Sequence, residues 1–536
     1  MKRFIKWLKS SSSDRFLLLV AVILINLVSI NGFFRFDLTS QRAYSLSKAS
    51  KEVIKHIDSP LSVKVFFSKN LPAPYNNVEQ YLTDILTEYK SNGSKYFSYQ
   101  VYDMSKEENQ QQAQSLGIYP VQIDQVETSG FSSKIAWMGV AITYGDYIAA
   151  IDSLKTTTDI EYKITTTITK IINAQENNNE QLFEIGYIKG HGEHELRSNP
   201  YAQYIAQLGC EGFRNLLSDI YSIKEIDITN SEIPSKIKTI IINGPQQTFS
   251  QDQILKIDNF IKNGGNAVFF IDPLKELPAQ QNSFPQYIPN VTGLEPLLSE
   301  YGITIENKMI FDDECVIQYQ NTGKQLFNFA PVVDKKRVAK NHPVTKNLGG
   351  IVFYTVGPVT IDPAKNKNIT VLAKTSDKSW ATDKNIVLYP GYTLPSEDDS
   401  ELKENIIAVT AEVPSKIVVV SSSIITTDIL VNQDKSPTEL FIKNVVDYAS
   451  GNEDFCEMRT KGTRLDFISI KSQKSALIIQ LLNEFGLAVI VVLIGFVAWR
   501  MKITRQYLIG QKYNPNDSRF IDKKDSSKYK EDKDND

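Results

Sequence analysis

Two long apolar runs interrupt the pattern of hydrophobic and polar residues along the chain. After Arg15, 19 residues carry no charge, and the 24 residues from Ala476 to Trp499 contain Glu484 as their only charged side chain. At ~1.5 Å per residue, a helix of either length spans the hydrocarbon core of a bilayer. We therefore predict transmembrane helices over residues 16–34 and 476–499.

The charges that flank these runs predict their orientation. Lysines and arginines precede the first run and follow the second, and such residues favour the cytoplasmic side of a membrane. Residues 1–15 and the polar tail, 500–536, are therefore predicted to be cytoplasmic, and the tail to be disordered. A cleaved signal peptide is the alternative for the first run, which is longer than the usual ~7–15 apolar residues. Glu484 is either a contact inside the membrane or a residue that reaches the interface.

The segment after the first run, residues 35–155, is predicted to form a separate domain. It reads as a strand with alternating Val63, Val65 and Phe67, a helix with apolar residues at helical spacing, and a second strand. A short helix ending at Gly117 and a third strand led by Pro120 follow. This order resembles a thioredoxin-like domain, but the sequence has no Cys-x-x-Cys motif, which argues against thiol redox chemistry.

Residues 156–450 alternate between apolar strands and amphipathic helices. The runs QLFEIGYI, KTIIINGP and NAVFFIDP are typical of strands buried on both faces, which predicts a doubly wound parallel sheet of the flavodoxin or glutamine-amidotransferase type. Short apolar runs predict a β-rich insertion at about 280–410. The run SKIVVVSSS is expected to return the chain to the sheet, and residues 451–475 form a linker.

A cluster of ionisable residues follows the first of these strands, in the stretch GYIKGHGEHEL. We expect the strand to end here and a helix to begin, at the sheet edge where open α/β folds bind ligands. His191 and Glu193 could act as a general base pair, or His191 and His194 as metal ligands. The spacing is not that of a zinc motif, so we predict no metal site and no catalytic residue, but a ligand- or partner-binding turn. That candidate turn consists of Gly190, His191, Gly192, Glu193 and His194.

Composition narrows the possible functions further. A net charge of −3 and a pI near 6.0 give no reason to expect nucleic acid as a partner. Cys210, Cys315 and Cys456 are far apart and are predicted to be unpaired structural thiols. An amidotransferase-like hydrolase needs a nucleophile on a tight strand-to-helix turn, and the turns NGPQQTFS and FIDPLKEL carry neither cysteine nor a Gly-x-Ser-x-Gly motif. No cofactor is predicted.

Several motifs in a fixed order resemble a known family. They are FRFDLTSQRAYSLSK, EIGYIKGHGEHEL, IIINGPQQTFSQDQILKIDNFIKNGGNAVFFIDP, NHPVTKNL and LFIKNVVDYASGNEDFCEMRTKG. Together they are similar to the GldG-like, gliding-motility-associated auxiliary proteins of ABC transporters. This resemblance implies a two-pass protein of the bacterial inner membrane whose large domain lies in the periplasm. It also implies an ABC permease and a cytoplasmic ATPase as partners, besides the lipid bilayer and an unknown cargo or envelope partner.

The sequence thus predicts a non-enzymatic, substrate-binding-like component of an ABC transporter complex. It contains no G-x-x-x-x-G-K-[ST] phosphate loop, so ATP hydrolysis is expected to come from another polypeptide. Two alternatives stay open: a membrane-tethered hydrolase that uses the His191/Glu193 turn, and a structural scaffold of the cell envelope.

Overall fold

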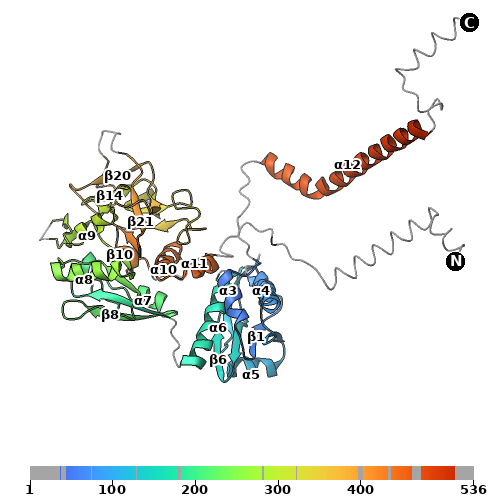
Figure 1. The fold of residues 1–536 in the computed structure, drawn as a ribbon, viewed down its shortest axis with the longest axis horizontal. Helices are drawn as coiled ribbons and strands as arrows, with labels where there is room; N and C mark the ends of the chain where they lie inside the picture. The colour runs from blue at the N-terminus through green and yellow to red at the C-terminus, as the bar shows by residue number, and fades with distance from the viewer. Residues whose placement is uncertain are drawn as a thin grey trace, which may run out of the picture. The chain divides into compact units, whose positions relative to one another are not determined.

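The structure is a computed structural model in which the chain divides into two units, Met1–Arg464 and Leu465–Asp536 (Figure 1). It describes residues 37, 44–73, 75–127, 130–157, 159–177, 183–279, 283–320, 323–395, 402–431, 436–460 and 473–513. The predicted cytoplasmic segment 1–15 and the predicted transmembrane helix 16–34 lie outside the described residues. The first unit contains two main sheets, one of four and one of seven strands, and each packs against its own apolar cores.

The first sheet has four strands in the order β2-β1-β5-β6, with β1 parallel to β2 and antiparallel to β5. Alternation along β1 sends Val63 and Val65 to one face, where they share a core with α4 and α6, and Phe66 to the other face, where it meets α5. Helix α3 packs against both α4 and α6. The elements are α3 (Lys48–Lys55), β1 (Leu61–Phe67), α4 (Val78–Asn92), β2 (Phe97–Asp103), α5 (Glu107–Ser115), β5 (Met138–Tyr144), β6 (Tyr147–Ile151) and α6 (Ile160–Asn177).

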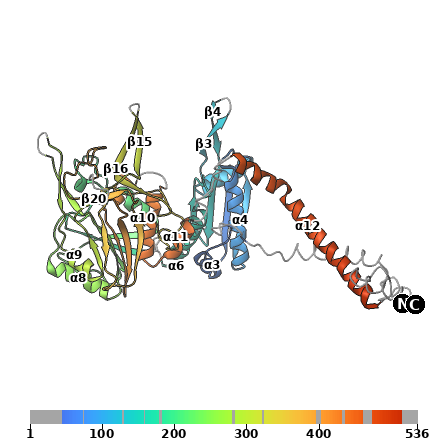
Figure 2. The same ribbon diagram turned by 90° about the horizontal axis from the view of Figure 1, so that it is seen from above.

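The predicted third strand of this sheet is displaced. The segment after Pro120 forms β3 (Val121–Glu127), which pairs only with β4 (Gly130–Ala136) in a separate hairpin (Figure 2). The third place in the sheet belongs to β5, whose sequence MGVAITY is almost entirely buried. A strand in the middle of a sheet covered on both faces needs a continuous apolar run, and β5 supplies one where the more polar β3 does not.

The second sheet has seven strands in the order β19-β21-β22-β10-β9-β7-β8. The last five are mutually parallel, whereas β21 runs antiparallel to β22 and β19 antiparallel to β21, so the predicted all-parallel sheet is in fact mixed at one edge. As predicted, the SKIVVV run returns to the sheet, as β22 beside β10. The strands are β7 (Phe183–Lys189), β8 (Tyr221–Asp227), β9 (Thr239–Asn243), β10 (Asn266–Phe270), β19 (Ile369–Lys374), β21 (Ile406–Glu412) and β22 (Lys416–Val420).

Helices cover both faces of this sheet, as the strand–helix alternation predicts. On one face, Phe213 of α7 and Phe441 of α10 share a core with Val268 of β10. On the other face, Ile257 of α8 packs in a core with Phe269, the next residue of β10. The helices are α7 (Glu211–Ser218), α8 (Gln251–Lys262) and α10 (Pro437–Ala449).

The region between β10 and β21 contributes small sheets of two or three strands beside the main one. Its Trp380 is buried and stacks on Phe311 at a centroid distance of 5.8 Å. The elements are β11 (Leu274–Leu277), β12 (Gln286–Pro289), α9 (Glu295–Glu300), β13 (Ile303–Ile305), β14 (Met309–Asp312), β15 (Cys315–Gln320), β16 (Gly323–Val333), β17 (Ile351–Val352), β18 (Val359–Ile361) and β20 (Ser379–Thr382).

One short helix, α11 (Glu453–Thr460), joins the two sheet domains of the first unit. It contacts α10 of the second domain and both α3 and α6 of the first (Figure 2). The Ser50 hydroxyl of α3 donates to Met458 Sδ at 3.1 Å, and the Arg459 guanidinium lies 4.5 Å from the ring centroid of Tyr162 on α6. Residues of α11 therefore hold the two domains against each other.

The second unit contains α12 (Gln473–Tyr513). Within the described residues it is the single helix with a stretch, Glu484–Gly510, long and apolar enough to cross a membrane by length and composition. The helix passes the predicted end of the span at Trp499, so residues 500–513, which we expected to be disordered, are helical.

Candidate functional site

The predicted turn lies at the carboxyl end of β7. Gly190 and Gly192 have φ angles of +114° and +77°, a conformation that glycine adopts without strain. The chain that follows does not enter a helix as predicted: α7 starts only at Glu211, after a loop with a 3₁₀ turn at Ile205–Gln207. Pro200 and Gly209 lie within this loop, and both residue types disfavour a helix interior.

His191 is an internal residue of this turn. Its side chain is 6% exposed and stacks on Phe249 at a centroid distance of 3.7 Å. The His191 Nε2 atom lies 3.0 Å from Gln253 Oε1. Because the Gln253 amide nitrogen donates to Thr229, the Oε1 atom is the acceptor, and this network assigns the proton to His191 Nε2. The ring thus connects the turn to the start of α8.

Glu193 faces the same imidazole. Its Oε2 atom accepts a 2.7 Å hydrogen bond from the His191 backbone N–H, and its Oε1 atom lies 3.5 Å from His191 Nδ1. The carboxyl group is 1% exposed, and burial raises its pKa above the usual range. The structure therefore brings His191 and Glu193 together, as an internal pair whose side chains are covered by the protein.

His194 belongs to a different network. Its Nδ1 atom donates to the Leu208 carbonyl oxygen at 2.9 Å, and its Nε2 atom lies 2.8 Å from Ser423 Oγ. Burial lowers the pKa of this imidazole to about 4. His191 and His194 therefore have separate partners, and among the described residues no three His, Cys, Asp or Glu side chains gather to hold a metal ion.

Ser423 also contacts an acid. Its Oγ atom lies 2.5 Å from Asp272 Oδ2, and its backbone N–H donates to Asp272 Oδ1 at 2.7 Å. Ser423 and Asp272 are 0% and 3% exposed, and burial raises the pKa of Asp272 to about 6. The side chains of His194, Ser423 and Asp272 form a continuous buried chain, called here the His–Ser–Asp chain.

A second layer of polar groups closes this edge of the sheet. The Asn243 amide donates to Thr426 Oγ1 at 2.8 Å and to Tyr187 Oη at 3.2 Å, and Tyr187 Oη donates to the His194 carbonyl at 2.6 Å. Cys210 lies 3.5 Å from Thr426 Oγ1, and burial raises the pKa of its thiol to about 12. The edge where open α/β sheets bind ligands is filled here by the protein's own side chains.

The His–Ser–Asp chain differs from a hydrolytic triad in its connections. In a triad, the acid orients the imidazole and the imidazole contacts the serine. Here the carboxyl group of Asp272 contacts the serine, and the outer nitrogen of His194 faces a backbone carbonyl. The arrangement can share protons, but the Ser423 hydroxyl is enclosed.

The sequence did not single out Asp272, Ser423 or Asn243. Asp272 and Ser423 lie within three residues of the ends of β10 and β22, and Asn243 is the last residue of β9. The sequence could have indicated these three residues, because each is a polar residue at the end of a predicted buried strand. The carboxyl ends of parallel strands meet at one edge of the sheet, so such residues are expected to lie close together.

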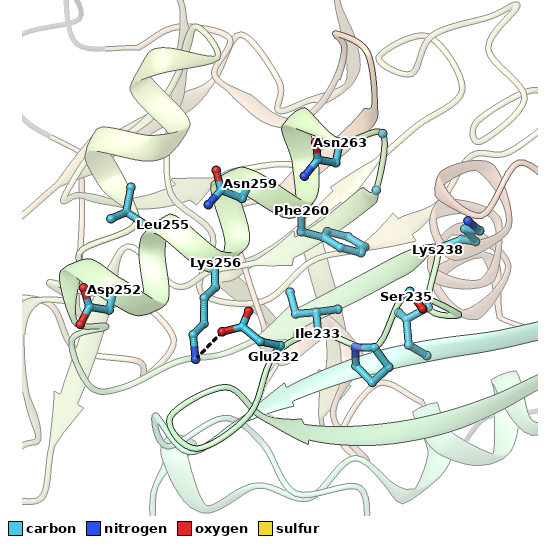
Figure 3. Close-up of a pocket in the computed structure, with 14 residues that line it drawn as sticks. Glu232, Ile233, Ser235, Lys238, Asp252, Leu255, Lys256, Asn259, Phe260 and Asn263 are labelled. Atoms are coloured by element: carbon cyan, nitrogen blue, oxygen red, sulfur yellow. Dashed lines mark ion pairs between the residues drawn. The ribbon is translucent and has the colours of Figure 1, made fainter.

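A hollow of about 520 Å³ lies elsewhere, beside α8 (Figure 3). Its wall includes Asn259 and Phe260 of α8, and Lys256 forms an ion pair with Glu232 at 3.3 Å across it. Lys238 and Gly265, which immediately precede β9 and β10, place the hollow at the amino edge of the sheet. The hollow next to Asp272 holds only about 20 Å³.

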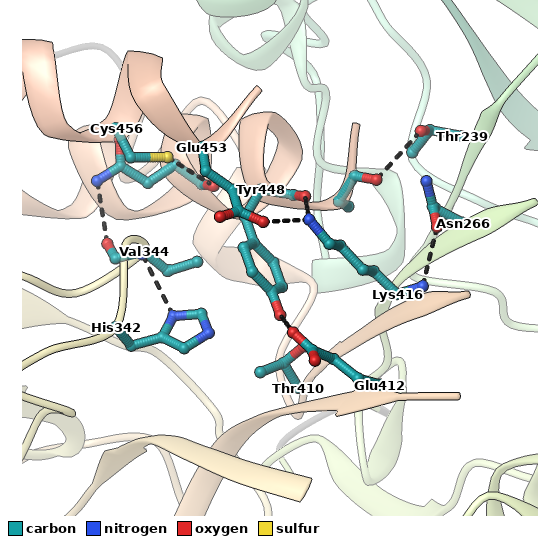
Figure 4. Close-up of polar contacts among 12 residues, drawn as sticks. Thr239, Asn266, His342, Val344, Thr410, Glu412, Lys416, Tyr448, Glu453 and Cys456 are labelled. Carbon is teal, nitrogen blue, oxygen red and sulfur yellow. Dashed lines mark hydrogen bonds and ion pairs between the residues drawn. The ribbon is translucent and has the colours of Figure 1, made fainter. Parts of the chain in front are cut away.

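A polar cluster at the end of α10 fastens the helices to the sheet (Figure 4). Tyr448 Oη donates to Glu412 Oε1 at 2.7 Å, and Lys416, which is bonded to Glu453, lies 4.5 Å from the Tyr448 ring centroid. His342 packs edge-on against the same ring, and burial lowers the pKa of its imidazole to about 4. Each of these groups is engaged within the protein.

Glu484 is the first residue of the apolar stretch of α12. Its side chain is exposed in the structure and accepts a 3.2 Å hydrogen bond from Gln480, one turn earlier. The predicted span 476–499 would place this carboxyl group inside the apolar run, whereas the stretch in the structure begins with it.

Two family models match the chain. A family described as an ABC-type uncharacterized transport system matches residues 184–457, which is just over half of the 536 residues, and a domain of unknown function, DUF7088, matches residues 40–143. A search of curated proteins finds no match to this chain. The transport-system match covers the second sheet domain, and the DUF7088 match covers the first sheet domain from α3 into β5.

Similar solved structures are distant. The mmIFT52 N-terminal domain is 14% identical, with a TM-score of 0.34, and the match covers 50% of this chain and 97% of that one. A ThuA-like protein from Parabacteroides merdae is 10% identical, with a TM-score of 0.28 and coverages of 51% and 91%. PurLQS from Thermotoga maritima is 8% identical, with a TM-score of 0.25 and coverages of 50% and 99%. At these TM-scores, none of them bears on function.

Proposed function

Because the chain belongs to the family of ABC-type uncharacterized transport systems, we propose that it is a membrane-anchored auxiliary component of an ABC transporter. The observation that carries this proposal is the family match over residues 184–457, which extends from β7 into α11. No phosphate loop occurs in the sequence, so the proposed complex includes a separate ATPase together with a permease.

In the proposed topology the chain crosses the bacterial inner membrane twice. The apolar run 16–34 and helix α12 support the two crossings, and the flanking positive charges support cytoplasmic ends with the two sheet domains in the periplasm. The order β2-β1-β5-β6 supports a thioredoxin-like assignment of the first domain. The ordered sequence motifs support a GldG-like identity, and a role in gliding motility would follow from it.

The proposed contact with cargo or with an envelope partner uses the substrate-binding-like outer domains. The side chains of His191, Glu193 and His194 are buried, so the predicted turn would offer its exposed backbone at Gly190 and Gly192. The hollow beside α8 is a second surface of suitable size, since ligand pockets commonly measure ~300–1,000 Å³.

The proposed role is non-enzymatic. The enclosed Ser423 hydroxyl, the internal His191–Glu193 pair and the raised pKa of Cys210 support this proposal, because a nucleophile must be reachable and activated. The rival hydrolase would use His191 and Glu193. Hydrolysis of ester or amide substrates that the H191Q and E193Q variants lose, while they still assemble with their partners, would favour that rival.

Purification of the full chain from native membranes in a mild detergent tests the transporter proposal. We expect an ABC permease and an ATPase to be recovered with it. The L493R variant, with a charge in the middle of the apolar stretch of α12, should lose these partners, because a central arginine costs ~3 kcal/mol or more in a membrane. The L493A variant is the matched control and should keep them.

Recovery of the wild-type chain without ABC subunits, under conditions that preserve other membrane complexes, would contradict the proposal. A different result would distinguish a scaffold role from the transporter role: a scaffold would support normal envelope function even when the ATPase is inactive.

A further inference from the structure

The hydrogen atoms of the His–Ser–Asp chain can be counted from its partners. The Leu208 carbonyl can only accept, so His194 Nδ1, at 2.9 Å, carries a hydrogen and donates. In a neutral imidazole, His194 Nε2 is then an acceptor. An ionised Asp272 is also acceptor-only, and the Ser423 hydroxyl between them, at 2.8 and 2.5 Å, has a single hydrogen.

The usual protonation states at neutral pH therefore leave this chain one hydrogen short. If the Ser423 hydroxyl donates to Asp272, a lone pair of Ser423 Oγ faces the lone pair of His194 Nε2. If the hydroxyl donates to His194 instead, a lone pair of Ser423 Oγ faces the Asp272 carboxylate. His194, Ser423 and Asp272 are each at most 3% exposed, so water does not surround these atoms. An unmatched buried acceptor costs ~1–3 kcal/mol, and more when it is charged.

One added proton removes the mismatch in two equivalent ways. A proton on His194 Nε2 gives an imidazolium that donates to Ser423, which donates to the carboxylate. A proton on Asp272 gives a carboxylic acid that donates to Ser423, which donates to the neutral imidazole. In both arrangements every hydrogen has an acceptor, and the chain as a whole is neutral.

We propose that His194, Ser423 and Asp272 form one buried proton-binding site, which holds a single shared proton at neutral pH. This inference is independent of the transporter proposal. The proton bridges three strands of the sheet, because His194 follows β7, Asp272 follows β10 and Ser423 follows β22. The site thereby fastens the edge of the sheet that would otherwise be open to ligands.

Ionisable groups on the elements that surround the site are acids, a phenol and a thiol. They are Glu193 on the same turn, Tyr187 on β7, Cys210 before α7, Asp428 in the loop after β22, and Glu295 of α9. The Asp428 carboxylate and the phenol and thiol groups bring no positive charge to repel the proton. Burial raises the pKa of the Asp272 carboxyl and lowers that of the His194 imidazole. The hydrogen count, with a single hydroxyl hydrogen between two acceptors, assigns the added proton to the pair rather than to one residue.

The direction of the pH dependence follows from proton counting. In the unfolded chain Asp272 is ionised and His194 loses its proton near pH ~6.5. The folded site keeps its proton above that pH, so the folded state binds more protons and stability falls as pH rises. The bound proton makes its full contribution to the free energy of unfolding below pH ~6.5, and this contribution is lost as pH rises through the folded-state pKa of the pair. One linked proton changes the folding equilibrium constant up to tenfold per pH unit.

The test compares wild type with D272N, as full chains in mild detergent. An asparagine can donate from its amide nitrogen to Ser423 Oγ and accept the Ser423 N–H, so the serine donates to neutral His194 and no proton is needed. We expect the thermal unfolding midpoint of wild type to fall from pH 6.5 to 9 more steeply than that of D272N. D383N removes one exposed carboxylate of the same domain and should keep the wild-type slope.

Two further measurements cover the case in which D272N does not fold. In the H194Q variant the glutamine amide can donate to Ser423 Oγ, and the Ser423 hydroxyl can then donate to an ionised Asp272. Position 194 then carries no titrating group, so this variant should also show a flatter dependence of the unfolding midpoint on pH. Denaturation of wild type at pH 7.5, followed in buffers of different ionisation enthalpy, should release about one proton per chain. Parallel pH profiles for wild type and the folded variant, or denaturation without proton release, would overturn the proposal.

Discussion

Close packing around single residues determines how the protein fills the carboxyl edge of the seven-stranded sheet. Gly244 follows β9 with a φ of +68°, and a Cβ atom there would lie 2.6 Å from His194 Cδ2 and 2.8 Å from Ser423 Oγ. No side chain fits this position while the His–Ser–Asp chain keeps its geometry. The sequence NGP indicated a turn at this position, but the sequence alone could not show that its glycine packs against a histidine 50 residues earlier.

The G244A variant should therefore be destabilised by ~3 kcal/mol or more, from backbone strain together with a clash against buried groups. G264A is the matched control: Gly264 has a φ of +90°, but an added Cβ meets nothing within 4 Å, so its cost should be limited to strain of ~1 kcal/mol. Chemical denaturation of both variants measures the difference. Equal costs would show that the packing around Gly244 relaxes freely.

The three cysteines are a second feature of the residue scale. Cys210, Cys315 and Cys456 are buried and form no disulfide, and burial raises the pKa of each thiol, to about 12 for Cys210 and about 11 for Cys315. The thiolate is the reactive form, so we expect no alkylation by iodoacetamide at pH 8 in the folded chain and three modified thiols after denaturation. Mass spectrometry counts the adducts, and rapid labelling of the native chain would contradict the burial.

At the scale of elements, continuous apolar runs were the reliable signal. The runs that became β7, β9, β10 and β22 predicted strands correctly, because burial on both faces requires apolar residues at successive positions. The stretch from Glu195 to Cys210 was wrongly predicted as helix, because its apolar residues pack from a loop stabilised by long-range contacts. One of these is the bond between Cys210 N and Glu195 O at 2.8 Å. Such contacts leave no periodic pattern in the sequence.

Two ion pairs formed by α11 differ in burial and should differ in energy. Asp447 of α10 pairs with Arg459 of α11, with side chains 0% and 3% exposed, and also accepts from Tyr221. Removing this charge in D447N leaves a buried guanidinium without a counter-charge, which should cost ~3–5 kcal/mol.

The half-exposed pair of Lys416 and Glu453 provides the comparison. The E453Q variant should cost less than ~1 kcal/mol, because water screens a pair whose side chains are 25% and 44% exposed. Urea denaturation of the two variants ranks them, and similar losses would mean that α11 depends equally on both contacts. This difference could not be predicted from the sequence, which shows neither the partners of these charged residues nor their burial.

At the scale of the whole molecule, the family match and α12 support a protein associated with the membrane. The proposed topology can be tested because the native thiols are buried and give a low labelling background. Tyr201 in the second sheet domain and Tyr513 at the end of α12 are 85% and 76% exposed. A membrane-impermeant maleimide added to spheroplasts should label Y201C and leave Y513C unlabelled until the membrane is opened. Labelling of both, or of Y513C alone, would contradict the orientation.

The position of α11 has a mechanical consequence. The chain leaves the first unit shortly after this helix, and α12 begins at Gln473, 13 residues beyond Thr460. A pull along the chain from α12 would be delivered first to Arg459 and Met458, which contact Tyr162 and Ser50 of the other domain. A force on α12 would thus act first on the contacts between the two sheet domains and not on the outer edge of either domain. A small displacement of α11 would therefore change the packing of the two domains against each other.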